Sequence, residues 1–185
     1  MSLPTEPMHW TRGEFLISTD KTYLSLAAIN HAFGQDYMYW ASPFPEEILE
    51  KIIDNSFCFG VYSLDSHLLC DDENGHPQRP VEALKAADAR NIGFARLVTD
   101  GVTFAYLTDL YVLPEYQGQG LGGWLIDCVD EVVRPLPYLR WLMLRTSAAK
   151  SQASYETRLG MKVLDTGDAT KGAVMMGRQG AAGRA

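Results

Sequence analysis

The stretch Leu107–Val133, LTDLYVLPEYQGQGLGGWLIDCVDEVV, decides the fold class that we predict for this chain. It begins as a β-rich run, passes through a glycine-rich turn at Gln117–Gly123, and continues as an amphipathic helix. Glycines at a helix N-terminus let backbone N–H groups, which carry a partial positive charge, approach an anion without Cβ atoms in the way. The order strand, turn, helix therefore indicates a phosphate-binding site, although a turn built only for packing can contain two such glycines.

Two common nucleotide-binding motifs fit this stretch poorly. Gly118, Gly120 and Gly123 satisfy the spacing GxGxxG, but a Rossmann turn directly follows its strand and precedes an acidic residue roughly 20 positions later. Here Leu113–Gln117 separate the strand from the glycines, and apolar residues stand where the acid is expected. A Walker A loop is excluded because Gly-Lys-Ser and Gly-Lys-Thr occur nowhere in the sequence.

The whole chain, residues 1–185, has the length and the 46% hydrophobic content of a single domain. Asp100-Gly101 between two β-rich runs predicts a hairpin. We expect strands at Glu14–Ser18, Phe57–Ser63, Asn91–Thr99, Thr103–Val112, Trp141–Arg145, Lys162–Leu164 and Val174–Met176. We expect helices at Lys21–Phe33, from Pro45 onward, at Gly120–Val133 and at Ser151–Leu159. Asp65–Arg90 has no core periodicity and reads as a surface insertion, and Gly177–Ala185 as a flexible tail.

Composition excludes several classes of protein. A net charge of -7 and a pI near 5.0 disfavour a nucleic-acid binder, which needs clustered cations. Cys58, Cys70 and Cys128 lack the spacing of a zinc site or a disulfide scaffold, so we expect reduced thiols and no metal. Met1–Arg12 has no apolar leader core and no run approaches ~20 apolar residues. We therefore expect a soluble, cytoplasmic protein with no membrane partner; a nuclear location stays open.

Leu107–Val133 resembles the pyrophosphate-binding motif of the GNAT superfamily of acyl-CoA N-acyltransferases, Q/R-x-x-G-x-G/A, with Gln117, Gly120 and Gly122 at its defined positions. The element order from Phe15 to Met176 is similar to that fold. The resemblance implies an α/β (α+β) domain with a mixed, mostly antiparallel sheet of about six or seven strands and about four helices, splayed between strands four and five. It also implies acetyl-CoA as co-substrate, with residues that bind it at Leu110, Tyr111, Val112, Gln117, Gly118, Gln119, Gly120, Leu121, Gly122 and Gly123.

Acyl transfer to an amine needs a proton acceptor for the amine and a donor for the departing thiolate. The segment SYETRLGM resembles the family's Y-x-x-x-G-F/M element, which implies that the Tyr155 hydroxyl is the donor; an aromatic that only packs the helix is the competing interpretation. For the acceptor, Asp109 lies where relatives use a carboxylate, but it can equally bind loop amides. Tyr106 stands where some relatives carry a glutamate, so a water-mediated route or an amine already neutral in solution stays open.

The acceptor pocket of this superfamily is walled by the region between the first two helices, which here contains Asp36–Trp40. Tyr39 and Trp40 would suit a cationic amine through cation–π contact, or they cover the core. His31 is a further acceptor-side candidate because histidine exchanges protons near neutral pH, although a lone helical histidine is more often a core residue. We expect a small-molecule amine acceptor and a monomer or homodimer. The alternatives are a protein N-acetyltransferase and a non-catalytic acyl-CoA sensor.

Overall fold

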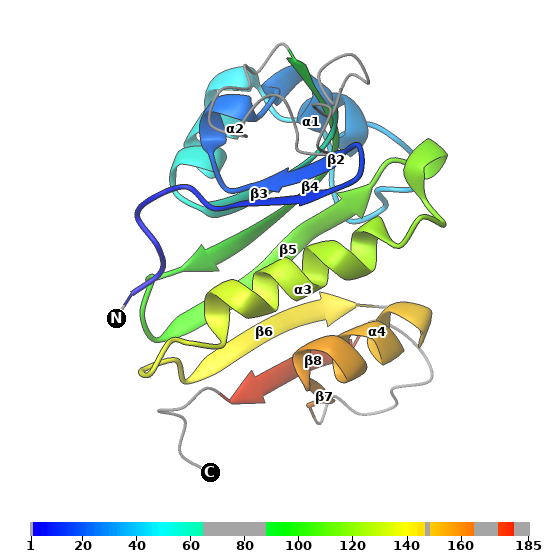
Figure 1. Cartoon of the computed structure of the whole chain (residues 1–185). Helices are drawn as coiled ribbons and strands as arrows, with labels where there is room; N and C mark the ends of the chain where they lie inside the picture. The colour runs from blue at the N-terminus through cyan, green and yellow to red at the C-terminus, as the bar shows by residue number, and fades with distance from the viewer. Residues whose placement is uncertain (1, 65–87, 147–148, 165–173, 180–185) are drawn as a thin grey trace, which may run out of the picture.

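An eight-stranded sheet in the order β1-β2-β3-β4-β5-β6-β8-β7 forms the centre of the protein (Figure 1). The computed structural model describes residues 2–64, 88–146, 149–164 and 174–179. The strands are β1 His9–Arg12, β2 Phe15–Ser18, β3 Phe57–Leu64, β4 Ala89–Thr99, β5 Phe104–Val112, β6 Trp141–Thr146, β7 Lys162–Val163 and β8 Val174–Gln179. The helices are α1 Leu26–Phe33, α2 Glu46–Asp54, α3 Leu121–Val133 and α4 Ala149–Leu159, with short 3-10 turns η1 Lys21–Tyr23 and η5 Pro114–Tyr116.

The predicted fold class is confirmed, with one more strand than the upper expectation. All neighbouring strands pair antiparallel except β5 and β6, which pair parallel. The additional strand is β1, which pairs with β2 from Arg12↔Phe15 to His9↔Ser18. Sequence periodicity missed it because its four residues are only half-buried or exposed and show no apolar alternation.

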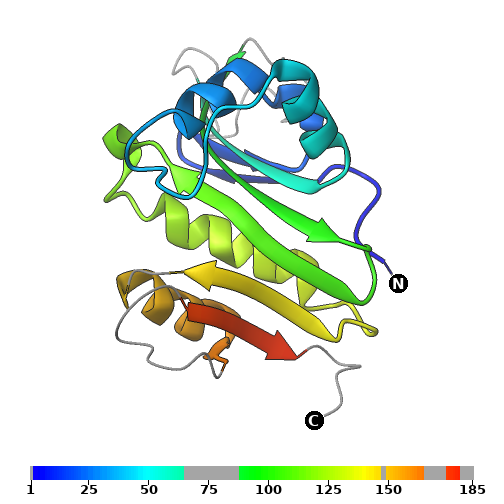
Figure 2. The same ribbon diagram turned by 180° about the vertical axis from the view of Figure 1, so that it is seen from behind.

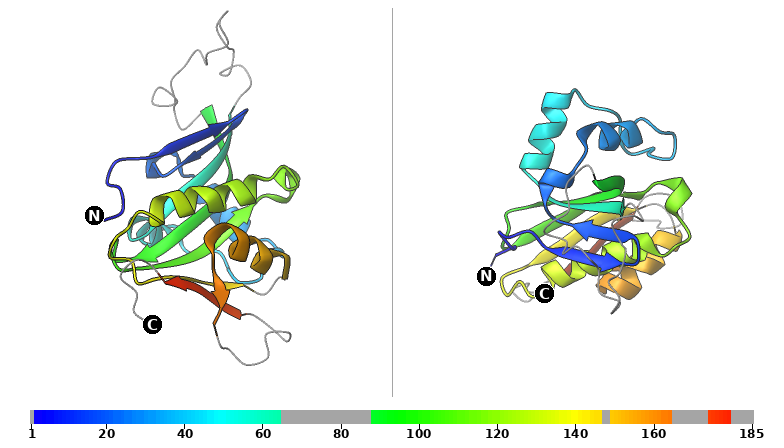
Figure 3. Two further views of the ribbon diagram at one scale, coloured as in Figure 1. Left: turned by 60° about the horizontal axis from the view of Figure 1, so that its bottom comes forward. Right: turned by 45° about the horizontal axis from the view of Figure 1, so that its top comes forward.

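The helices cover both faces of the sheet. Helix α3 contacts β5 and α4, and Figure 3 (left) shows α3 and α4 side by side on one face. Helices α1 and α2 contact β4 and β3 on the opposite face, which Figure 2 shows from behind. Three buried clusters result: one around α3, one beneath α1 and α2, and a smaller one that includes Tyr23 and Tyr62. The apolar stripe predicted for α3 is buried apart from Trp124, which is half-buried.

The first helix is shorter than predicted, and its buried face is different. The η1 turn and an extended link precede α1, which begins after Ser25, whose hydroxyl accepts a hydrogen bond from the Ala28 N–H. A helix that runs unbroken from Lys21 predicts an apolar stripe of Leu24, Ala27, Ala28 and His31, whereas the buried residues of α1 are Ile29, Ala32 and Phe33. The prediction was wrong because it carried one helical phase from Lys21 through a stretch that is not helical.

The predicted hairpin at Asp100 is confirmed. One carboxylate oxygen of Asp100 accepts hydrogen bonds from the N–H groups of Val102, Thr103 and Phe104, and Gly101 has φ +78°. The carboxylate therefore holds the loop between β4 and β5 closed, which fixes the register of the two strands. The hydrogen bond that the Thr103 hydroxyl donates to the other carboxylate oxygen, together with those backbone hydrogen bonds, lowers the pKa of Asp100 well below its usual range.

Two predicted surface segments lie largely outside the described residues. Of the insertion predicted at 65–90, residues 65–87 are not described, and Ala89 and Arg90 already belong to β4. Of the tail predicted at 177–185, residues 177–179 belong to β8, which pairs Gln179 with Trp141, and residues 180–185 lie outside the described residues. Cys58 and Cys128 are buried free thiols, as expected; Cys70 lies in the undescribed part. Within the described ranges, no helix is long and apolar enough to span a bilayer.

Candidate active site

A cleft of about 640 Å³ opens at the point where β5 and β6 separate. The two strands pair from Phe104↔Trp141 to Leu107↔Leu144, while β5 continues to Val112 (Figure 1). The splay predicted between strands four and five is therefore present, between β5 and β6. The cleft is lined by residues of β5, β6, α4 and the loop after α1: Tyr106 to Leu110, Leu144 to Thr146, Ser151, Tyr155, Tyr39 and Trp40.

Tyr155 contributes the wall of the cleft that belongs to α4. Its ring packs partly buried against the main core cluster, and its hydroxyl makes no hydrogen bond to another residue of the described ranges. Burial raises the pKa of Tyr155 to about 12, because the phenolate would be poorly solvated there. The hydroxyl is therefore neutral at physiological pH and available as a hydrogen-bond donor to a group in the cleft.

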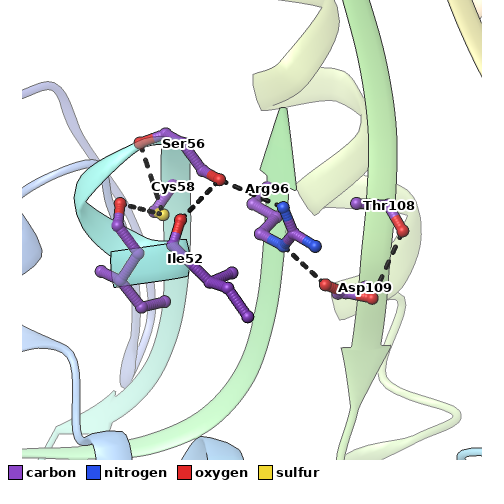
Figure 4. Close-up of polar contacts among 7 residues, drawn as sticks. Ile52, Ser56, Cys58, Arg96, Thr108 and Asp109 are labelled. Carbon is purple, nitrogen blue, oxygen red and sulfur yellow. Dashed lines mark hydrogen bonds and ion pairs between the residues drawn. The ribbon is translucent and has the colours of Figure 1, made fainter. Parts of the chain in front are cut away.

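Asp109 contributes to the opposite wall but is engaged by an arginine that sequence reasoning did not consider (Figure 4). Arg96 Nε donates to Asp109 Oδ2 at 2.6 Å, and Arg96 Nη1 donates to Ser56 Oγ at 3.1 Å. The Ser56 hydroxyl in turn donates to the carbonyl of Ile52 in α2. The side chains of Arg96 and Asp109 are only 17% and 12% exposed, so this ion pair is shielded from solvent.

Asp109 also has an unusual backbone. With φ 54°, it is the one non-glycine residue of the described chain in the left-handed region. The β4–β5 register explains this, since Phe94 pairs with Tyr111 and Arg96 with Thr108, so that β5 carries one extra residue opposite Ala95. The bulge occurs immediately beyond Leu107, the last residue of β5 that pairs with β6.

The glycine loop lies between the end of β5 and the start of α3. Gly118 and Gly120 have φ +83° and +77°, a conformation in which a side chain is strained, and Gly120 is the N-cap residue of α3. No side chain caps this helix, so its first N–H groups are left for another acceptor. Gln117 donates from Nε2 to the carbonyl of Val112, which holds the loop against the end of β5.

Two arginines flank this loop, and sequence reasoning named neither. Arg12 of β1 donates to the carbonyl of Gln119 and lies over the ring of Trp124, 5.2 Å from its centroid. Arg158 of α4 occupies the space beside Gly123, where an added Cβ would lie 2.7 Å from its guanidinium. Gly123 was predicted as a ligand-binding residue; its lack of a side chain is explained at least as well by this packing.

The remaining residues predicted to bind the co-substrate lie at the edge of β5 that β6 leaves. Leu110 lines the cleft, whereas the side chains of Tyr111 and Val112 are buried in two of the core clusters. Their backbones pair with Phe94 and Gly93 on the β4 side. Beyond Leu107, no described strand pairs with the other edge of β5, which leaves backbone groups for an extended ligand.

On the acceptor side, Tyr39 and Trp40 line the cleft, and His31 does not. The two rings meet edge to face with centroids 4.9 Å apart and are 72% and 46% exposed, so they do not cover the core. His31 is exposed on α1, where its ring lies 3.4 Å from the side chain of Gln35. It was predicted on the acceptor side because histidine exchanges protons near neutral pH, and the structure places its side chain outside the residues that line the cleft.

The residues that the sequence analysis missed differ in how far they could have been found. The predicted hairpin places Arg96 near the middle of β4 but not opposite Asp109; only the observed register, with Thr99 opposite Ala105 and Arg96 opposite Thr108, brings the two side chains together. Nothing in the sequence marks the bulge or brings Arg12 to the loop, because both depend on strand pairing. Among the described residues, no group of three or more His, Cys, Asp or Glu side chains could hold a metal ion.

Comparison with known proteins gives one family. The profile described as the Acetyltransferase (GNAT) family matches residues 35–161. The chain is 39% identical over 168 residues to a proposed acetyltransferase of Gibberella zeae, covering 91% of this chain and 90% of that protein.

Solved structures agree on the fold. A proposed GNAT-family acetyltransferase of Xanthomonas campestris pv. campestris superposes with a TM-score of 0.58 at 29% identity, covering 82% of this chain and 86% of that one. The ribosomal-protein-S18-alanine N-acetyltransferase of Escherichia coli gives a TM-score of 0.54 at 20% identity, covering 92% and 96%. At that identity the second likeness concerns the fold alone.

Proposed function

The chain belongs to the acetyltransferase (GNAT) family, and we propose that it transfers an acetyl group from acetyl-CoA to a primary amine of a small molecule. One arrangement supports this proposal. The cleft at the β5–β6 separation has Tyr155 on one wall. Strand β5, which forms its floor, leads through a loop with two left-handed glycines to the N-terminus of α3, which no side chain of the described residues caps. A thioester and a pyrophosphate need these two features at the two ends of one extended ligand.

The residues of this chain fit coenzyme A. The unpaired edge of β5 at Leu110–Val112 suits an extended pantetheine arm, which would add to the sheet through backbone hydrogen bonds. The N–H groups of Gly120, Leu121 and Gly122 suit the pyrophosphate, and the guanidinium of Arg12 lies beside them. When bound, acetyl-CoA supplies an activated acyl group to the cleft.

Tyr155 is proposed to act on the departing thiolate. Its neutral hydroxyl can donate a hydrogen bond to the sulfur as negative charge develops there. The site also holds the amine and the thioester together in one cleft, which replaces a bimolecular encounter and supplies part of the rate. Asp109 was predicted as the proton acceptor; its ion pair with Arg96 favours a different role, while a neutral amine or an ordered water can meet the need for a base.

The acceptor class follows from the exposed wall of the cleft. The faces of Tyr39 and Trp40 suit a cationic or aromatic amine, since an ammonium group over an aromatic ring is attracted to it. A protein N-terminus is the second candidate acceptor, because the exposed Tyr39 and Trp40 rings leave this wall of the cleft open to a chain end. A sensor without turnover differs from both of these enzymes because it would bind acetyl-CoA and release no free thiol with any acceptor.

Calorimetry with acetyl-CoA, followed by thiol release in the same preparation, tests the proposal. Polyamines, arylamines, amino acids, aminoglycosides and a peptide with a free N-terminus are offered as acceptors. Binding with release on a small amine supports the proposal, and release on the peptide alone makes the protein a protein N-acetyltransferase. Binding without release on any acceptor indicates a sensor, and absence of binding refutes the assignment of the glycine loop.

A further inference from the structure

We infer that Arg96 is a positioning residue: through Asp109 it holds the bulge of β5 that shapes the floor of the cleft, and Asp109 is its anchor rather than a proton acceptor. The catalytic part of this inference rests on the proposed function, whereas the structural part does not. It is carried by the contacts of Arg96, by the backbone of Asp109 and by the place of the bulge in the sheet.

The contacts of Arg96 join β4 to β5 and to the turn between α2 and β3 (Figure 4). From β4, its guanidinium donates to Asp109 on one side and to Ser56, between α2 and β3, on the other. Ser56 is fixed in turn by its hydrogen bond of 2.7 Å to the Ile52 carbonyl. The bulge is thereby tied to the last turn of α2, which is a fixed point outside the cleft.

The backbone of Asp109 needs such a tie. A residue other than glycine at φ 54° is strained and persists when surrounding contacts determine it. Beyond Leu107 the strand has lost the pairing with β6, so on that edge no described strand holds it in place. The ion pair at 2.6 Å, with both side chains largely buried, supplies the missing constraint.

Engagement of the carboxylate argues against proton acceptance. Oδ2 receives Arg96 Nε, and Oδ1 lies 3.3 Å from the Thr108 hydroxyl, so both oxygens have partners within the protein. A proton transferred to Asp109 would leave the guanidinium without its counter-charge in a largely buried place. The same carboxylate serves well as a fixed anchor, since the planar guanidinium constrains its orientation.

The bulge matters for the reaction because Thr108, Asp109 and Leu110 line the cleft. Misplacing the backbone there by about 1 Å would misalign the bound thioester and lower turnover by up to about 100-fold. Affinity for acetyl-CoA should change less than turnover, since the proposed pyrophosphate site lies in the loop beyond Val112 and only the proposed pantetheine contacts at Leu110–Val112 adjoin the bulge. Arg96 should therefore affect kcat more than binding.

The first test compares two substitutions of Asp109. Asp109→Asn keeps an oxygen that accepts from Arg96 Nε, and asparagine tolerates the left-handed region, so kcat should fall only about two- to fivefold. Asp109→Ala loses the anchor and adds strain, so kcat should fall about 10- to 100-fold, whereas the acetyl-CoA Kd should rise by no more than about fivefold because only the pantetheine contacts adjoin the bulge. Equal and severe losses of kcat in both variants would make Asp109 the proton acceptor and overturn the inference.

The second test concerns Arg96 itself and does not need turnover. Arg96→Met should accelerate amide hydrogen exchange at residues 108–112 by about tenfold or more, with β3 unchanged, and Arg96→Lys should restore part of the protection. The control is Arg140→Met, since Arg140 is exposed at the start of β6. Unaltered exchange in Arg96→Met would overturn the inference, whereas an inactive wild-type protein would refute only the proposed function.

Discussion

Substitution of Tyr155 by phenylalanine removes one hydroxyl from the cleft and little else. The ring packs against the core while the hydroxyl makes no hydrogen bond within the described ranges, so stability should change by no more than about 0.5 kcal/mol. Any loss of activity then reports on chemistry. This separation of effects makes Tyr155→Phe the most informative single change.

The magnitude follows from the environment of the phenol. General acids contribute about 10²–10⁴-fold, and a donor to a developing anion about 10²–10³-fold. Burial raises the pKa of Tyr155 to about 12, far above that of a thiol, so complete proton transfer to the thiolate is uphill and the lower end applies. We expect kcat to fall about 100-fold, which is about 2.7 kcal/mol in the barrier.

Steady-state thiol release with saturating amine, together with calorimetry of acetyl-CoA, measures both quantities. The Kd should stay within about twofold of wild type. The hydroxyl stays neutral until the pH approaches 12, so Tyr155 should cause no loss of wild-type rate between pH 7 and 10. Tyr138→Phe, at an exposed tyrosine, is the matched control. A Tyr155→Phe enzyme that retains at least half of wild-type kcat would refute the role of this hydroxyl.

Three further predictions concern the loop, the acceptor wall and the buried thiol. Gly120→Ala should weaken acetyl-CoA binding by about tenfold in calorimetry, because alanine is strained at φ +77°. The control is Gly101→Ala, at φ +78° in a distant turn, which should lower the free energy of unfolding by a similar amount and leave acetyl-CoA binding unchanged. Trp40→Ala should raise KM for the amine about 5- to 30-fold at constant Kd for acetyl-CoA, and an unchanged KM would remove the ring from the acceptor site. Burial raises the pKa of Cys58 from 9.0 to about 12. The neutral thiol therefore contributes fully to stability below pH 9, and this contribution is lost as the pH rises toward 12. Urea unfolding should show that the wild-type protein loses about 1 kcal/mol of unfolding free energy by pH 10, and that Cys58→Ala loses less over the same range.

Local patterns predicted most elements because each depends on a few neighbouring residues. The hairpin follows from the ability of the Asp100 carboxylate to accept three N–H groups, and α3 follows from its apolar stripe and glycine start. The failures occur where a pattern is short or interrupted. Strand β1 has four residues without alternation, and the first helix was given a phase that its real start at Leu26 does not share.

The sequence by itself determined which chemical groups the chain contains: a glycine-rich turn before a helix, a tyrosine on a short helix, and the aromatic pair Tyr39 and Trp40. These are properties of residue types and spacing. Only the tertiary structure decided which of these residues line the same cleft. It also decided that Arg96 forms an ion pair with Asp109, and that Arg12 of the edge strand β1 contacts the glycine loop. The reason is physical, since a bulge and a strand pairing join residues far apart in sequence, and no local pattern specifies the partner.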